Sequence, residues 1–371
     1  MNTECDIILL SYESPDLLEK CAKSVLDYTT VTSRLIIVDN ASENSDVKKL
    51  INGLKDTDKV KIERIFNEKN EGFAGGINKG IDLSYAPYVC ILNNDCVVHG
   101  DWLGEMINIA GSRDNIGLVN PQSNTFGCDD PSSVSDKKGK FIELGHAIGF
   151  ACLIKRKVIE CIGDLDEAYQ GVCYEDTDFS SQAQKAGFIS VMAEGAYVFH
   201  LEQASRKGLK NNTAIYRRNR EIYEKRWGRL LRLLVVGNIA GHNMPDEYEL
   251  LRNLSRQRAI VERWKLADEN TKEYLSKIDG ENIIKHADVG IKIFDKNISQ
   301  AFILWKVLTK KKKYDAVIMN KSMASGVLRA AGVMRNTKVF LSDGVSRALS
   351  SRGESFDLND PASFADHLRA R

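Results

Sequence analysis

The stretch CDIILLSYESPDLLEKCAKSVLDYTTVTSRLIIVDN, residues 5–40, decides how the first part of the chain folds. Two continuous apolar runs, 5–12 and 34–40, are typical of buried strands. Between them, residues 15–28 carry apolar side chains at helical spacing, and Pro15 stands where the first turn of a helix tolerates it. The alternation continues with expected helices and strands at 44–55, 60–67, 72–86 and 88–95. This pattern predicts an α/β fold, with a mostly parallel sheet flanked by helices.

Polar residues follow each of these expected strands. They read SYE (11–13), VDN (38–40), NEKNEG (67–72) and LNND (92–95). In open, largely parallel sheets, ligands bind outside the carboxyl ends of the strands. We therefore expect a nucleotide and a metal ion at this edge of the sheet.

The middle of the chain is less regular, and its character changes after about residue 230. Before that point we expect strands at 117–121, 148–156 and 189–200 and helices at 177–188 and 212–227. Beyond it we expect a strand from 231, helices at 250–264, 298–308 and 322–334, strands at 314–320 and 337–344, and a loosely attached helix in 355–371. The sequence thus predicts two domains, 1–229 and a smaller α/β unit of unknown role at 230–371.

The composition excludes several classes of protein. The 371 residues have a net charge of +1 and no basic stripe alternating with aromatics, which argues against a nucleic-acid partner. No apolar run approaches the roughly 20 residues of a membrane span, and acidic residues stand where a signal peptide would be basic. The eight cysteines form no C-x-x-C pair, so we interpret them as buried thiols in a reducing compartment. We expect a cytoplasmic protein.

Two strand ends carry candidate ligand-binding side chains. In LNND, Asn93 and Asp95 project to the same side of an extended segment, and their hard oxygens suit Mg²⁺ or Mn²⁺. The structural alternative is a polar turn after a buried strand. In VDNAS, Asp39 could accept hydrogen bonds from a base or a ribose, or it could cap a helix.

Two further motifs have a structural and a chemical interpretation. The glycines of NEGFAGGINKG, 70–80, miss the spacing of dinucleotide and P-loop motifs, so they either let a ligand approach or pack a helix on the sheet. YEDTDF, 174–179, holds three acids at an expected helix start. The helix dipole favours acids there but does not require three. His200, at the end of an expected strand, is by itself more often structural than a ligand.

Taken in order, these motifs resemble the family 2 glycosyltransferases of the GT-A fold, in particular a rhamnosyltransferase-like branch. The matching segments are SYES, VDNAS, NEGFAGGINKG, LNND, GFACLIKRKVIECIGDLDEAY, YEDTDFSSQAQKAGF and VFHLEQAS. They cover residues 4–229, and 230–371 lie outside the resemblance. Two positions depart from the family pattern, because Asn93 replaces an Asp and Gln203 stands where Gly is frequent.

The resemblance implies a role for each matching position. Ser11, Tyr12, Glu13 and Asp39 would hold the base and ribose, with Gly76, Asn78 and Asn94 also bordering the nucleotide. Asp95 would be the main metal ligand, assisted by Asn93 and His200. Asp176 would be the catalytic base and Glu175 its companion, whereas Asp178 would serve the helix start. Each of these residues stands within one of the matching segments.

The implied activity is an inverting, metal-dependent transfer of a sugar from a UDP- or dTDP-sugar to a hydroxyl of a glycan or lipid-linked glycan, as in surface polysaccharide synthesis. The alternatives are a non-catalytic sugar-nucleotide binding or scaffolding subunit, and a nucleotidyltransferase, which would need a glycine-rich loop that SYESPDLLEK lacks. For 230–371 we expect an interaction module, an acceptor-binding domain or the first half of a second transferase. Lys310–Lys313 are expected on a solvated helix end, with peripheral contact to the inner face of the membrane as the minority alternative.

Overall fold

The computed structural model describes residues 3–171, 173–201, 213–236, 244–266, 276, 284–295, 314–320, 338–342, 347–350 and 355–370. Contacts divide the chain into two units, Met1–Trp227 and Gly228–Arg371. The expected helices at 298–308 and 322–334, Gln203 and the lysines 310–313 lie outside the described residues.

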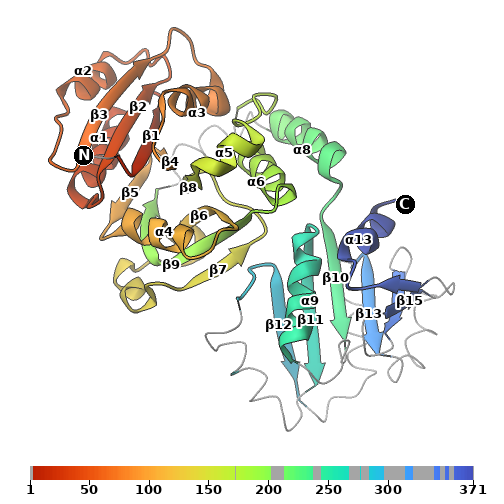
Figure 1. The fold of residues 1–371 in the computed structure, drawn as a ribbon. Helices are drawn as coiled ribbons and strands as arrows, with labels where there is room; N and C mark the ends of the chain where they lie inside the picture. Colours follow the sequence, from red (N-terminus) through yellow and green to blue (C-terminus); the bar gives the residue numbers. More distant parts are fainter. Residues whose placement is uncertain are drawn as a thin grey trace. The chain divides into compact units, whose positions relative to one another are not determined.

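One sheet organises unit 1 (Figure 1). Its strands are β1 Cys5–Ser11, β2 Ser33–Asp39, β3 Val60–Phe66, β4 Tyr88–Asn93, β5 Cys96–His99, β6 Ile116–Gln122, β7 Phe141–Leu144, β8 Ala151–Lys155 and β9 Ile189–His200. Within the described residues they form a nine-stranded sheet in the order β3-β2-β1-β4-β8-β6-β9-β5, with β7 also paired to β9. All pairings from β3 to β4 are parallel, and β6 pairs with β9 in parallel. The mostly parallel sheet expected from the sequence is confirmed, with β5, β7 and β8 running the other way.

Helices cover both faces of this sheet. They are α1 Pro15–Tyr28, α2 Ser45–Gly53, α3 Gly72–Leu83, α4 Trp102–Gly111, α5 Arg156–Ile162, α6 Glu175–Lys185 and α8 Thr213–Trp227, with two 3₁₀ segments at Asn124–Phe126 and Pro131–Lys137. Apolar side chains of α1, α2 and α4 pack in one core with alternate residues of β1 and β2. Those of α3, α5 and α6 pack in a second core with the intervening residues. β1 and β2 are therefore buried on both sides, which explains their continuous apolar sequence.

The glycines of α3 allow this helix to lie close to β1. A Cβ atom on Gly80 would lie 2.4 Å from Ile8 Cγ2, and one on Gly76 would lie 2.5 Å from Leu10 Cδ1. Neither distance is sterically allowed, so only glycine permits this approach. The NEGFAGGINKG motif therefore packs a helix against the sheet.

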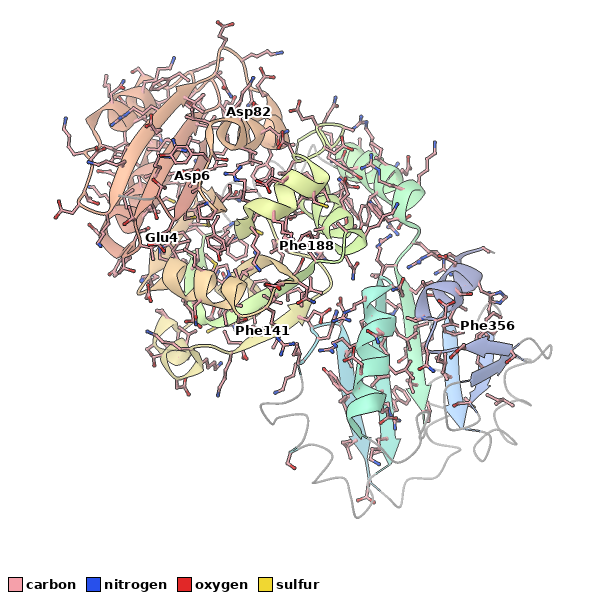
Figure 2. All side chains as sticks on the ribbon, viewed as in Figure 1. Glu4, Asp6, Asp82, Phe141, Phe188 and Phe356 are labelled. Carbon is pink, nitrogen blue, oxygen red and sulfur yellow. The ribbon has the colours of Figure 1, made fainter. Side chains whose placement is uncertain are left out.

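The amino-terminal edge of the sheet is fixed by a buried carboxylate, Asp6 on β1 (Figure 2). It accepts hydrogen bonds from Arg34 Nε at 2.7 Å and from the backbone N–H groups of Tyr85 and Ala86 at 2.6 and 2.7 Å. Arg156 on α5 lies 3.8 Å away. One side chain thus joins β1, β2, the segment before β4, and α5.

Unit 2 is a second α/β fold. Its elements are β10 Leu231–Val236, α9 Met244–Arg256, β11 Ala259–Leu266, β12 Val289–Phe294, β13 Ala316–Asn320, β14 Lys338–Ser342, β15 Arg347–Ser350, β16 Ser355–Asp357 and α13 Pro361–Arg369. The sheet has the order β12-β11-β10-β13-β14-β15-β16, parallel from β12 to β14 and antiparallel beyond. The smaller α/β unit expected from the sequence is therefore present.

Two expectations for unit 2 are wrong. The helix expected at 250–264 ends at Arg256, and the rest belongs to β11, because Arg258 adopts a left-handed conformation with φ 55° that terminates the helix. The terminal helix is not loosely attached, since Phe364, Ala365 and Leu368 are buried in the core of unit 2. Among the described residues, no helix has both the length and the apolar character needed to cross a membrane.

Candidate active site

The carboxyl ends of β1 and β2 bring Ser11 and Asp39 together. These residues are register partners in the parallel pair, and both are fully buried. Asp39 Oδ1 accepts a hydrogen bond from the Ser42 N–H at 3.1 Å. Within the described residues, neither Asp39 Oδ2 nor Ser11 Oγ has a hydrogen-bond partner. Because buried polar atoms are normally paired, the two atoms indicate a polar ligand at this edge.

The two residues after Ser11 differ in what they offer a ligand. Tyr12 is 48% exposed, so its ring is available for stacking against a base. Glu13 has a left-handed φ of 54°, and its carboxylate accepts hydrogen bonds from the backbone N–H groups of Glu43 and Asn44 at 2.7 and 3.3 Å. Glu13 therefore holds together the loops after β1 and β2.

The structure places Gly76 and Asn78 in the scaffold of α3. Gly76 faces Leu10, as described above. The Asn78 amide donates to the Leu165 carbonyl and to Glu167 Oε1, both at 2.9 Å, and its Oδ1 accepts from the Leu165 N–H at 3.1 Å. These contacts engage both ends of the Asn78 amide in fixing the loop that follows α5.

Asn40, the residue after Asp39, organises the approach to α3. Its Nδ2 donates to Asn70 Oδ1 and to the Gly72 carbonyl, each at 3.0 Å, while its Oδ1 accepts from Asn67 Nδ2 and the Glu71 N–H. The sequence feature that could have predicted this network is the repeated Asn in VDN and NEKNEG. Amide side chains both donate and accept hydrogen bonds, so several of them can bond to one another.

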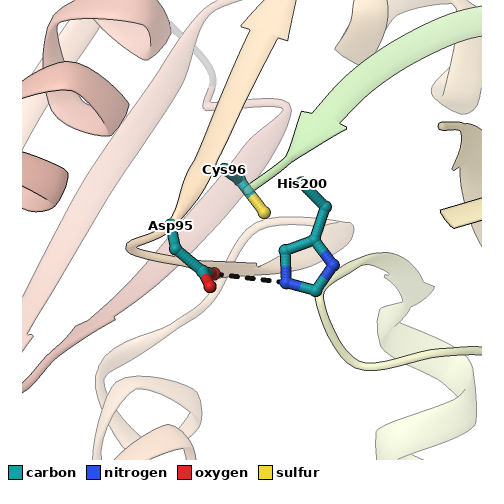
Figure 3. A group of neighbouring side chains, drawn as sticks. All are labelled: Asp95, Cys96 and His200. Carbon is teal, nitrogen blue, oxygen red and sulfur yellow. Dashed lines mark ion pairs between the residues drawn. The ribbon is translucent and has the colours of Figure 1, made fainter. Parts of the chain in front are cut away.

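A second group of polar atoms lies where β4, β5 and β9 meet (Figure 3). Asn93 ends β4, Asn94 and Asp95 form the turn, and His200 ends β9. His200 Nε2 lies 3.3 Å from Asp95 Oδ1, and both residues are buried. Asp95, Cys96 and His200 each offer one ligand atom, and these atoms all lie within 4.8 Å of one another. Cys96 was not among the residues that the sequence singled out.

Neighbouring side chains hold the His200 ring in place. Its Nδ1 lies 3.2 Å from Thr125 Oγ1, and its ring stacks on Phe150 with centroids 4.9 Å apart. Asn124 accepts from the His200 N–H and donates to the His200 carbonyl, both at 2.8 Å. A ring fixed in this way keeps Nε2 directed at Asp95, which is the usual arrangement around a metal-binding histidine.

The acid pair begins α6. Asp176 Oδ2 accepts a hydrogen bond from the Gly149 N–H at 2.9 Å, and its Oδ1 accepts from the Thr177 N–H at 2.6 Å. The two preceding residues, Cys173 and Tyr174, have left-handed φ values of 80° and 79°. Such conformations cost about 1–3 kcal/mol each in non-glycine residues and cluster at functional sites. Backbone strain here sets the direction of the first turn of α6.

Glu175 has a different environment from Asp176. Its side chain is buried, and Oε2 has no hydrogen-bond partner within the described residues. Burial, together with the neighbouring Asp176 carboxylate, raises the pKa of Glu175 to about 8. The raised pKa favours the neutral form of Glu175 at neutral pH.

Asp178 is fully buried in a network of donors. It accepts hydrogen bonds from Tyr169 Oη at 2.9 Å, Gln182 Nε2 at 2.8 Å, Trp227 Nε1 at 2.7 Å and Arg226 at 2.9 Å. This network ties α6 to α8, which is a structural role. The third acid of YEDTDF is therefore occupied by protein groups, whereas Glu175 keeps an unpaired oxygen.

Phe150 and Gly149 connect the acid pair to the group around Asp95. The Phe150 carbonyl accepts from the Asn93 N–H at 2.8 Å and from Cys96 Sγ at 3.3 Å. The preceding residue, Gly149, holds Asp176. Beside Asp176 lies a small pocket whose other walls are apolar and include Phe73, Cys152 and Phe179. Residues 149 and 150 thus link the candidate metal ligands to Asp176 through the backbone.

The segment that carries most of these residues is similar to a known family. Residues 6–163 match the sequence model of the family described as "Glycosyl transferase family 2". The matched segment contains every candidate nucleotide contact, together with Asn93 and Asp95. The matched segment of unit 1 is therefore similar to this family.

Individual proteins are similar at a lower level. A curated protein of Sinorhizobium fredii (strain NBRC 101917 / NGR234), described as "Uncharacterized protein y4gI", is 24% identical over 247 residues, which cover 60% of this chain and 27% of that protein. The chain thus spans about a quarter of the length of that relative.

Three solved structures are also similar. GalNAc-T7 with UDP, GalNAc and Mn²⁺ is 16% identical, with a TM-score of 0.43 over 54% of this chain and 44% of that one. The mannosyltransferase PcManGT from Pyrobaculum calidifontis, in complex with GDP-Man and Mn²⁺, is 14% identical, with a TM-score of 0.42 over 59% and 69%. S. aureus TarS 1–349 is 13% identical, with a TM-score of 0.42 over 53% and 60%.

Proposed function

We propose that residues 1–229 form an inverting, metal-dependent glycosyltransferase of the rhamnosyltransferase-like branch. It would move a sugar from a UDP- or dTDP-sugar to a hydroxyl of a glycan or lipid-linked glycan, in the cytoplasm at the inner face of the membrane. One observation carries the proposal. Four buried polar atoms, Ser11 Oγ, Asp39 Oδ2, Asp95 Oδ2 and His200 Nε2, have no hydrogen-bond partner within the described residues.

The spacing of these atoms along the sheet suits a nucleoside diphosphate. Asp39 ends β2 and Asn93 ends β4, with β1 between them. Two strand spacings amount to about 10 Å. A base and ribose held at Ser11 and Asp39 would extend the diphosphate toward Asp95 and His200.

The unpartnered atoms Asp95 Oδ2 and His200 Nε2 fit a divalent cation, because both are buried and belong to side chains that lie next to each other (Figure 3). A cation bound there would neutralise the negative charge that develops on the nucleoside diphosphate as it leaves. Asp95 and His200 would hold it, with Asn93 and Asn94 bordering the diphosphate.

Asp176 is the proposed catalytic base. The Gly149 and Thr177 N–H groups fix its carboxylate, and the N-terminus of α6 favours its ionised form. It would take the proton from the acceptor hydroxyl while that oxygen attacks the sugar. A single displacement inverts the anomeric centre. Glu175, neutral beside it, would contact the acceptor without adding a second charge.

Replacement of the proposed base tests the function. Asp176→Asn should abolish sugar transfer and leave binding of the nucleotide sugar unchanged, since the amide keeps the shape but cannot take a proton. Transfer is measured with radiolabelled UDP- and dTDP-sugars, and donor binding by calorimetry. The control Asp82→Asn, at an exposed position of α3, should transfer normally. Full transfer by Asp176→Asn would refute the assignment, and donor binding without transfer by the wild type would indicate a binding subunit.

A further inference from the structure

The residue after Asp95 is a cysteine whose position in the sheet directs it at the same point. Cys96 opens β5 and is the antiparallel register partner of His200. Residues paired in this way have their side chains on the same face of the sheet, with Cβ atoms about 5 Å apart. Cys96 is fully buried, and its thiol donates to the Phe150 carbonyl at 3.3 Å.

The atoms around this thiol are acceptors facing one another. His200 Nδ1 lies 3.2 Å from Thr125 Oγ1, and His200 Nε2 lies 3.3 Å from Asp95 Oδ1, with either a proton or a cation able to occupy the space between Nε2 and the carboxylate. Two electron-rich atoms 3.3 Å apart repel unless a proton or a cation lies between them. Bond lengths of 2.0–2.1 Å at a tetrahedral ion place an oxygen and a nitrogen ligand about 3.3 Å apart.

The donor set decides which cation fits. Mg²⁺ requires octahedral oxygen ligands and keeps several waters. A carboxylate, an imidazole and a thiol instead suit a borderline or soft ion, and catalytic zinc sites use three protein ligands with one position open.

We propose that Asp95, Cys96 and His200 form a three-ligand site for a thiophilic divalent cation such as Zn²⁺ or Co²⁺. On binding, the S–H bond of Cys96 breaks, the metal–sulfur bond forms, and the proton passes to solvent. The open position takes an oxygen of the donor diphosphate, a feature that rests on the proposed transferase function. The metal preference follows from the ligands alone and differs from the Mg²⁺ or Mn²⁺ expected from the sequence.

Cobalt binding tests the site without turnover. The full chain is treated with a chelator and titrated with Co²⁺ alone. One equivalent should produce an intense near-ultraviolet band from thiolate-to-cobalt charge transfer, together with the visible bands of tetrahedral cobalt. Cys96→Ser should lose the near-ultraviolet band, and the control Cys161→Ser, at an exposed position of α5, should keep it.

A direct measurement on the wild type covers the case in which Cys96→Ser fails to fold. The ¹¹³Cd NMR shift of the cadmium-loaded chain should report a single sulfur ligand. A wild type without the thiolate band, a band that persists in Cys96→Ser, or a cadmium shift typical of oxygen and nitrogen ligands alone would overturn the proposal.

The two proposals fail in distinguishable ways. Transfer supported by Mg²⁺ without any thiolate band would refute the cysteine ligand and leave the glycosyltransferase function intact. A thiolate band in a chain that transfers no sugar would support the site and contradict the function.

Discussion

Glu175→Gln should remove a pH dependence from the stability of unit 1. The pKa of Glu175 is raised from 4.5 to about 8 by burial and by the charge of Asp176. Because the folded state binds this proton more tightly than the unfolded chain does, the stabilisation is present at low pH and is lost as pH rises through about 8. With these two pKa values, linkage gives a loss of at most about 2–3 kcal/mol between pH 5 and pH 7.

The assay is urea unfolding at a series of pH values from 5 to 8, with hydrogen exchange of α6 to assign the transition to unit 1. The variant should gain stability relative to the wild type as pH rises, by up to about 2–3 kcal/mol at pH 7 compared with pH 5. Glu160→Gln, at an exposed position of α5, serves as the control and should show the wild-type profile. Parallel profiles for Glu175→Gln and the wild type would show that Glu175 is ionised at neutral pH, against this reasoning.

Three further substitutions separate scaffold from ligand contacts. Gly80→Ala should destabilise unit 1 by about 1–3 kcal/mol in urea unfolding, because its Cβ would lie 2.4 Å from Ile8. The control is Gly53→Ala, whose Cβ would meet nothing within 4 Å. Equal urea midpoints for the two variants would contradict the close packing of α3. Asn78→Leu should lower the free energy of unfolding by about 1–3 kcal/mol, because the Asn78 amide binds the loop after α5. The affinity for the donor, measured by calorimetry, should not change. Weakened donor binding in a stably folded variant would show that Asn78 contacts the nucleotide. Asp39→Asn should weaken nucleotide-sugar binding by about 10- to 100-fold through loss of a charged hydrogen bond, and unchanged affinity would remove Asp39 from the donor site.

The parallel half of unit 1 could be predicted because its local signals agree. α1 begins at Pro15 and ends at Tyr28 as expected, and β1 to β4 coincide with the apolar runs to within about two residues. The short strands β5 and β7 were missed because four residues carry too little periodicity. In unit 2, Ile260, Val261 and Trp264 suit a helical stripe as well as a strand, and the backbone break at Arg258 that decides between them leaves no sequence signal.

The sequence predicted the acidic residues of the candidate site, but only some of the residues that hold them in position. Strand ends pointed to Ser11, Asp39 and Asp95, because parallel strands place their carboxyl ends along one edge. Cys96 and Gly149 were not found, since their contacts with His200 and Asp176 arise from pairing between segments distant in the chain. Polar side chains that hold loops, such as Asn78, look the same in sequence as side chains that hold ligands.

The buried Asp6 has a consequence for attempts to change what the protein binds. It clamps β1, β2, the segment before β4 and α5 at the end of the sheet away from the orphaned polar atoms. Stability and recognition are thereby assigned to opposite ends of the same strands. Loops such as 11–14 and 67–71 therefore offer positions at which ligand specificity can be changed. Asp6 and its partners should be kept, because their hydrogen bonds maintain the stability that such substitutions in the loops require.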